Sequence, residues 1–147
     1  MTGLDRFKFF FLTDEEKERL MEKIAAALKK RWEIAFAYLH GSFLEEGPFR
    51  DIDLAVYLCK KAPGDADFLY EIRLEDDIRA LIPYPVDVRI LNNAPLSFRY
   101  SVLKNGRLLL ENAPDIRADF QEYVLDRYFD FVLFRKRYLK ETLGLEI

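Results

Sequence analysis

Apolar and polar positions alternate along the chain with two different periods, which predicts helices and strands in succession. From Leu20 through Ile24 to Leu28 the apolar residues recur every four positions, as they do on one side of a helix. The segment Thr13-Asp14-Glu15-Glu16 has the form of a capping box, which predicts the start of that helix. Residues 33–40 are apolar at odd and even positions alike, a pattern typical of a strand buried on both faces.

The rest of the chain continues this alternation. Residues 51–59 are rich in leucine, valine and tyrosine and predict a second strand, and residues 86–91 alternate in a way that predicts a third. The remaining expected elements are helices at residues 68–82, 96–104 and 114–140 and a short apolar strand at residues 107–111. We therefore expect a single α/β (α+β) domain over residues 1–147, with a small mixed β-sheet flanked by helices and a long C-terminal helix at about residues 114–140.

Carboxylates occupy one face of the second and third expected strands. Because side chains alternate across a strand, Asp51 and Asp53 project from the same face, while Ile52 between them points to the core. Asp87 lies opposite its apolar neighbours on the third strand, so the three carboxylates converge if the strands are adjacent. Carboxylates side by side repel each other, and a bound Mg²⁺ relieves that repulsion. The arrangement indicates a two-metal site for phosphoryl displacement, although an isolated Asp-x-Asp is more often a solvated strand edge or turn.

A glycine and a serine stand between the first two strands. Gly41-Ser42 directly follows the buried strand, and residues 42–46 have the composition of a short helix. Glycine lets the backbone approach a phosphate closely, and a helix start that carries a serine favours an anion. Gly41 and Ser42 are therefore candidate phosphate contacts, and the alternative interpretation is an ordinary tight turn.

Charge and cysteine content narrow the class of protein. The net charge is −3, whereas a protein that grips nucleic acid usually carries a basic surplus, so we expect no direct nucleic-acid partner. The single cysteine, Cys59, favours a reducing compartment. The apolar run at residues 9–12 is too short for a secretion signal, and no stretch is long enough to span a bilayer. These features predict a cytoplasmic protein without a membrane partner.

The order of these motifs is more specific than any one of them. A strand, Gly41-Ser42, a short loop, the Asp51-Ile52-Asp53 strand, a helix and the Asp87 strand together resemble the DNA polymerase β-like nucleotidyltransferase superfamily. Within it the chain looks most like the minimal nucleotidyltransferases (MNT), the antitoxins of HEPN/MNT toxin–antitoxin pairs. The resemblance covers most of the chain, from about Ala35 through the final helix.

The resemblance implies a role for each candidate residue. Gly41 and Ser42 would contact the phosphates of ATP, and Asp51 and Asp53 would hold Mg²⁺. Asp87 would complete the metal site and help to deprotonate the attacking hydroxyl. The chain departs from the family in the loop before Asp51, which looks shorter than in many MNT proteins. Residues 43–46 of this loop include two glutamates where the family often places an arginine.

The resemblance also implies the reaction and the partner. The expected activity is Mg²⁺-dependent transfer of AMP from ATP to a tyrosine of a partner HEPN toxin, which silences that ribonuclease. One alternative is a non-catalytic antitoxin that neutralises its partner by binding through the aromatic helix at residues 114–140. Another is nucleotidyl transfer to a small molecule, although the chain has no obvious room for the extra helical domain that such enzymes usually carry. Whether the chain associates with itself or only with its partner stays open.

Four further features have simpler interpretations. The aromatic residues of the last helix are expected to pack on the domain's own sheet. His40 is expected to be a structural residue at a strand end, with substrate contact as the alternative. Cys59 is expected to be a buried, inert thiol. Arg89 points with Asp87, either as an ion pair or as a cation for the site.

Overall fold

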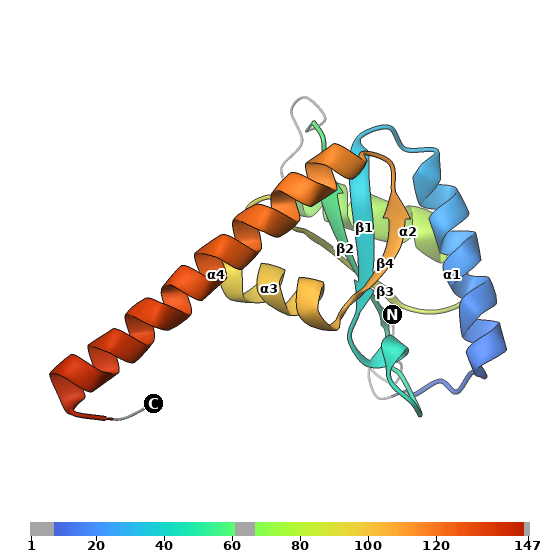
Figure 1. Cartoon of the computed structure of the whole chain (residues 1–147). Helices are drawn as coiled ribbons and strands as arrows, with labels where there is room; N and C mark the ends of the chain where they lie inside the picture. The colour runs from blue at the N-terminus through green and yellow to red at the C-terminus, as the bar shows by residue number, and fades with distance from the viewer. Residues whose placement is uncertain (1–7, 61–66, 146–147) are drawn as a thin grey trace.

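The computed structural model describes residues 8–60 and 67–145, and its elements follow the order expected from the sequence (Figure 1). They are α1 (Asp14–Lys29), β1 (Ile34–His40), the short 3₁₀ helix η2 (Ser42–Leu44), β2 (Ile52–Leu58), α2 (Asp67–Arg79), β3 (Val86–Ile90), α3 (Leu96–Asn105), β4 (Arg107–Glu111) and α4 (Pro114–Leu143). None of the helices in the described part of the chain is both long and apolar enough to cross a membrane.

The first helix begins where the capping box predicts. The backbone N–H of Glu16 donates to Oγ1 of Thr13 (N···O 3.1 Å), and the N–H of Thr13 donates to Oε1 of Glu16 (3.0 Å). These two bonds satisfy N–H groups that a helix start leaves without partners.

The four strands form one mixed sheet in the order β3-β2-β1-β4. β1 is antiparallel to both β2 and β4, whereas β2 and β3 are parallel. Helices α1 and α2 cover one face of the sheet, and α3 with the first half of α4 covers the other (Figure 1). The predicted fold class is therefore confirmed.

β1 lies inside the sheet, which explains its apolar character at every position. Ile34 and Leu39 pack into the core beneath α1 and α2, while Phe36 and Tyr38 pack into the core beneath α3 and α4. Side chains of both sets are almost fully buried. The prediction of a strand buried on both faces is confirmed.

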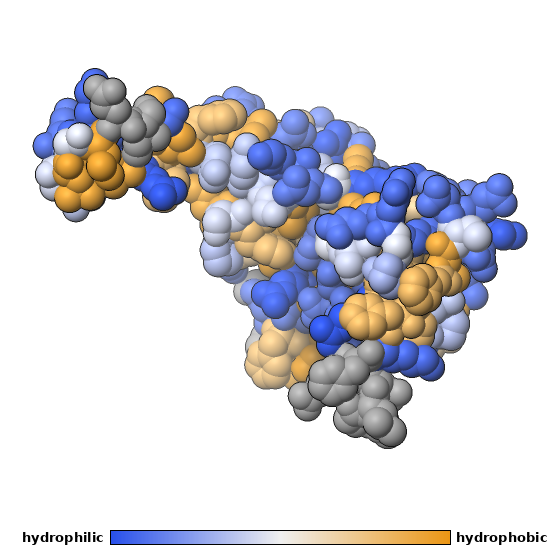
Figure 2. All heavy atoms as spheres, turned by 90° about the horizontal axis from the view of Figure 1, so that it is seen from below, coloured by the Kyte–Doolittle hydropathy of each residue, from blue (hydrophilic) through white to orange (hydrophobic). Residues whose placement is uncertain are grey.

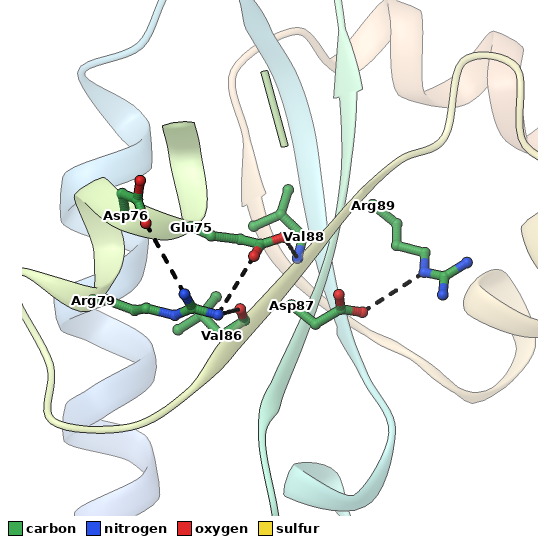
Figure 3. Close-up of polar contacts among 7 residues, drawn as sticks. All are labelled: Glu75, Asp76, Arg79, Val86, Asp87, Val88 and Arg89. Atoms are coloured by element: carbon green, nitrogen blue, oxygen red, sulfur yellow. Dashed lines mark hydrogen bonds and ion pairs between the residues drawn. The ribbon is translucent and has the colours of Figure 1, made fainter. Parts of the chain in front are cut away.

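Two glutamates of α2 close the outer edge of β3, and Figure 3 shows one of them, Glu75. The backbone N–H of Val88 donates to Oε1 of Glu75 (3.2 Å), and the N–H of Ile90 donates to Oε2 of Glu71 (2.9 Å). An edge strand otherwise presents unpaired N–H groups to other chains. Here the helix satisfies them, which keeps the edge closed and holds β3 in place beside β2.

The last helix is longer than predicted and leaves the body of the domain (Figure 1). Only Phe120 and Val124 of α4 are buried, and both lie in its first half. Further along, Phe129, Phe131 and Phe134 are 54%, 52% and 67% exposed. The expectation that the aromatic residues of this helix pack on the sheet is therefore wrong for its second half, because the helix extends beyond the sheet.

The predicted break at residues 62–65 lies outside the described residues. Cys59 is exposed, so the expectation of a buried thiol is wrong. The reason is that β2 ends at Leu58 and Cys59 already lies beyond the sheet's core.

Candidate active site

Two neighbouring strands bring the predicted carboxylates together. β2 and β3 are adjacent and parallel, and their register places Asp53 directly beside Asp87. Asp51 precedes Asp53 by two positions, and both are partly buried, while Ile52 between them is fully buried in the core. The predicted convergence of the three carboxylates requires that these two strands be adjacent, and the structure shows that they are.

The environment of Asp53 opposes its ionisation. The pKa of Asp53 is raised to about 7, mainly by burial of the carboxyl group and further by the negative charges of Asp51 and Asp87. A hydrogen bond between the Asp51 and Asp53 carboxyl groups acts in the same direction, whereas the positive charge of Arg89 acts against it. In the isolated chain, the positive charge of Arg89 is therefore too small an effect to offset the burial of Asp53 and the negative charges around it.

Gly41 lies against Asp53 and adopts a backbone conformation that glycine favours. Its φ is +80°, and a Cβ atom at this position would lie 2.1 Å from Oδ2 of Asp53. Any other residue would displace the carboxylate or strain the backbone. Ser42 follows at the start of η2 and is partly buried. The structure thus places the Gly41-Ser42 turn beside the carboxylates, as the order of motifs predicts.

Lys17 anchors the loop between Ser42 and Asp51, a role that sequence reasoning missed. Its side chain is only 7% exposed, and Nζ donates to the backbone carbonyl of Glu45 (2.9 Å). The ammonium also lies over the rings of Phe43 and Phe49, 5.4 and 5.7 Å from their centroids. A signal was available, because Lys17 stands four residues before Met21, a buried residue of the apolar side of α1.

His40 ends β1 directly opposite Asp53 in the antiparallel pair. The edge of its ring meets Phe98 of α3, with centroids 5.4 Å apart and planes at 82°. Burial lowers the pKa of His40, against the opposing effect of Asp87. Its Nε2 is buried without a hydrogen-bond partner in the described part of the chain. His40 therefore lies at the site in an environment that favours the neutral form of its ring.

Arg89 forms an ion pair with Asp87, which is one of the two roles that its position on β3 allows (Figure 3). Nε of Arg89 is 3.6 Å from Oδ2 of Asp87, and the guanidinium lies 5.8 Å from the ring centroid of Phe98. The Arg89 side chain remains 63% exposed. It therefore supplies positive charge beside the carboxylates while staying open to solvent.

The carboxylates suit a hard divalent cation by their chemistry. Three neighbouring aspartates offer carboxylate oxygens, the kind of ligand that Mg²⁺ prefers, and the raised pKa of Asp53 reflects its burial together with the negative charges of Asp51 and Asp87. Within residues 8–60 and 67–145, no three His, Cys, Asp or Glu side chains are already placed to hold one ion. Asp51 and Asp53 are hydrogen-bonded to each other, and Asp87 is paired with Arg89.

Comparison with solved structures finds the same fold in toxin–antitoxin complexes. A chain of the complex between a tri-AMPylated HEPN toxin of Shewanella oneidensis and an MNT antitoxin matches with a TM-score of 0.64 at 18% identity, covering 86% of this chain and 98% of that one. A chain of a toxin–antitoxin structure with AMP-PNP matches with a TM-score of 0.64 at 20% identity, covering 84% and 98%. A chain of the MntA–HepT complex matches with a TM-score of 0.62 at 18% identity, covering 86% and 98%.

Sequence comparison identifies the family directly. No curated protein sequence matches the chain. The family model described as polymerase beta, nucleotidyltransferase matches residues 22–115, which include Gly41, Ser42 and all three aspartates. Together with the sheet and the placement of Asp53 beside Asp87, this match establishes that the chain belongs to the polymerase β nucleotidyltransferase family.

Proposed function

We propose that this chain is a Mg²⁺-dependent protein adenylyltransferase that acts as an antitoxin. Its substrate is ATP, and its acceptor is a tyrosine of a HEPN-family toxin. The catalytic part of this proposal rests on one observation: in a chain of the nucleotidyltransferase family, Asp53 of β2 lies directly beside Asp87 of β3, and Gly41 packs against Asp53. This arrangement would serve little structural purpose, because it places like charges together in a partly buried position.

Each residue of the site has a proposed role. Asp51, Asp53 and Asp87 hold the metal, which when bound supplies positive charge against the triphosphate and the reacting phosphorus. Gly41 lets the backbone approach the phosphates closely, and Ser42 offers its hydroxyl at the start of η2. Ionisation of Asp53 is needed for its role as a ligand, so metal affinity rises with pH through the region around 7, where this carboxyl titrates.

The reaction is an in-line displacement at the α-phosphorus of ATP. A bond forms between the acceptor oxygen and the phosphorus, and the bond to the bridging oxygen breaks as pyrophosphate leaves. The hydroxyl proton passes to Asp87, whose carboxylate lies beside that of Asp53. Positioning and electrostatics perform most of such a transfer, so no covalent intermediate with the chain is required.

The choice of acceptor is supported by the similar structures. One of them contains a tri-AMPylated HEPN toxin with an MNT antitoxin, and another contains AMP-PNP. This chain spans 98% of the length of both matched chains. A HEPN-family protein encoded beside this chain is therefore the acceptor we propose.

Labelled ATP tests the proposal. The purified chain is incubated with Mg²⁺, ATP labelled at the α-phosphate and the HEPN-family protein that we propose as its acceptor. We expect label on a tyrosine of that protein, loss of transfer with Asp53→Asn, and unchanged transfer with Glu22→Gln, which removes an exposed acid of α1. Absence of label with every divalent metal and nucleotide tried would refute the enzymatic function.

A second candidate function is neutralisation by binding alone. The exposed second half of α4 favours it, because such a surface suits a protein interface. Toxin neutralisation in cells separates the two candidates. If catalysis is required, Asp53→Asn abolishes neutralisation, whereas binding alone would leave it intact.

A further inference from the structure

The end of α4 forms an arm that stands apart from the domain. Tyr128 makes the last ring contact with the body, stacking on Tyr100 of α3 with centroids 3.6 Å apart and planes at 5°. Residues 129–145, here called the α4 arm, then run outward (Figure 1). At 1.5 Å per residue its helical part is about 22 Å long. The arm ends in a left-handed Gly144, whose neighbour Leu145 donates back to the carbonyl of Leu139 (3.2 Å).

The α4 arm is apolar on two opposite sides. Successive residues of a helix are about 100° apart, so Phe129 and Leu133 share one side, and Phe131, Phe134 and Tyr138 share the other. All five side chains are at least half exposed, and Leu133 and Phe134 reach 64% and 67%. Figure 2 shows apolar atoms along the arm up to its far end. A helix that is apolar on both sides is normally buried within a protein, which indicates an occupant that surrounds it.

This arrangement disfavours a membrane surface as the occupant. A helix that lies in a membrane interface needs one apolar side and one polar side. On the α4 arm a membrane that covered Phe131 and Phe134 would leave Phe129 and Leu133 in water.

The charge of the α4 arm also constrains the partner. Its helical part carries four basic residues and two acidic ones, whereas the whole chain has a net charge of −3. The basic residues are Arg135, Lys136, Arg137 and Lys140. A second copy of the arm would bring like charges together, while an acidic surface would complement them.

We propose that the α4 arm inserts into an apolar groove between helices of a partner protein, and that acidic side chains rim this groove. The inference rests on the proposed function, because it takes the HEPN-family toxin as that partner.

Substitutions on the two sides of the arm test the proposal. Leu133→Glu and Phe134→Glu each place a charge on a different one of the two apolar sides, and Trp32→Glu is the matched control because Trp32 is 71% exposed and lies outside the arm. The affinity of each full-length variant for the purified HEPN-family protein that we propose as its partner is measured by calorimetry. We expect each arm variant to raise Kd by at least about tenfold and the control to stay within about twofold of wild type. Circular dichroism confirms that each variant keeps its helix.

Several results would overturn the inference. Loss of affinity with only one of the two arm variants would indicate a one-sided contact, and no loss with either would exclude the arm from the interface. A dimer of the isolated chain in light scattering, made monomeric by both variants, would assign the arm to a second copy. Binding to phosphatidylserine vesicles that the variants abolish would assign it to a membrane.

The same variants separate this inference from the proposed function. Asp53→Asn is expected to lose AMP transfer and to keep the wild-type Kd for the partner. Phe134→Glu is expected to keep the affinity of the isolated chain for AMP-PNP and to lose transfer to the partner at low concentration. If label is transferred although neither arm variant weakens binding, the arm inference is wrong and the proposed function stands. If the arm variants weaken binding but no label is transferred, the arm inference stands and the proposed enzymatic function is wrong.

Discussion

At the scale of single residues, Asp53 combines a partly buried position with two neighbouring negative charges. A carboxyl whose pKa is raised in the folded state binds its proton more tightly there than in the unfolded chain. The resulting stabilisation is fully present below the ordinary pKa of about 4 and is lost as the pH rises through about 7. The isolated chain is therefore less stable at the pH values at which Asp53 is ionised, which is the form that the proposed metal site requires.

Substitution of Asp53 by asparagine is expected to stabilise the isolated chain at pH 8. Asparagine has a similar shape and no charge, so it removes the repulsion from Asp51 and Asp87. The free energy of unfolding is measured by urea denaturation at pH 5.5 and pH 8. Between these two pH values it should fall less in the Asp53→Asn variant than in wild type. Glu22→Gln, at an exposed position of α1, should leave that difference unchanged. A variant that is less stable than wild type at pH 8 would contradict the assigned repulsion.

Alanine at Gly41 tests the contact between the turn and the carboxylate. The change strains a backbone with φ +80° and places Cβ 2.1 Å from the Asp53 carboxylate, so we expect both a loss of stability of about 1–3 kcal/mol and a large loss of AMP transfer. Gly47→Ala is the matched control, because Gly47 has φ +95° but nothing lies within 4 Å of its Cβ position. The control should lose stability through the backbone alone and keep its activity, as measured by thermal unfolding and the labelled-ATP assay.

Strand periodicity was enough to place Asp51 and Asp53 on one face, because that depends only on neighbouring residues. The raised pKa of Asp53 was not predictable, since it depends on burial and on the register that puts Asp87 beside it. The contact of Gly41 with Asp53 likewise arises from the packing of a turn against a strand that begins eleven residues later. Local pattern therefore selected candidate residues that the structure brings together, and tertiary packing determined the environment of Asp53.

At the scale of elements, the glutamates of α2 hold β3 in its place at the edge of the sheet. Glu75→Ala leaves the N–H of Val88 without its partner, so we expect a loss of about 1–2 kcal/mol in the free energy of unfolding. Hydrogen exchange of the Val88 amide should also accelerate. Asp76→Ala is the control, because that side chain is 68% exposed and pairs with Arg79 (Figure 3). Equal effects of the two substitutions would argue against a specific role of Glu75.

The helices and strands themselves were largely predictable, because their periodicity and caps are local features. The order β3-β2-β1-β4 was not, since pairing of β1 with β4 joins residues that are more than sixty positions apart. The course of α4 was mispredicted for the same reason. Aromatic side chains favour burial, but the sequence does not say whether the burying surface belongs to the same chain.

At the scale of the whole molecule, the domain should fold without the α4 arm. Phe120 and Val124 are the buried residues of α4, and Tyr128 makes the last ring contact with α3. A chain that ends after Tyr128 is therefore expected to melt within a few degrees of the full chain in calorimetry and to keep its affinity for AMP-PNP. A collapse of the melting transition would mean that residues beyond Tyr128 support the core.

The anchoring of the loop between Ser42 and Asp51 by Lys17 bears on how nucleotide binding would proceed. A loop that is already tied to α1 loses little conformational entropy when a ligand arrives, so binding energy is not spent on ordering it. The nucleotide would then meet a preorganised surface rather than a closing lid. Amide hydrogen exchange in residues 43–49 should accordingly change little when AMP-PNP is added, whereas a lid would become strongly protected.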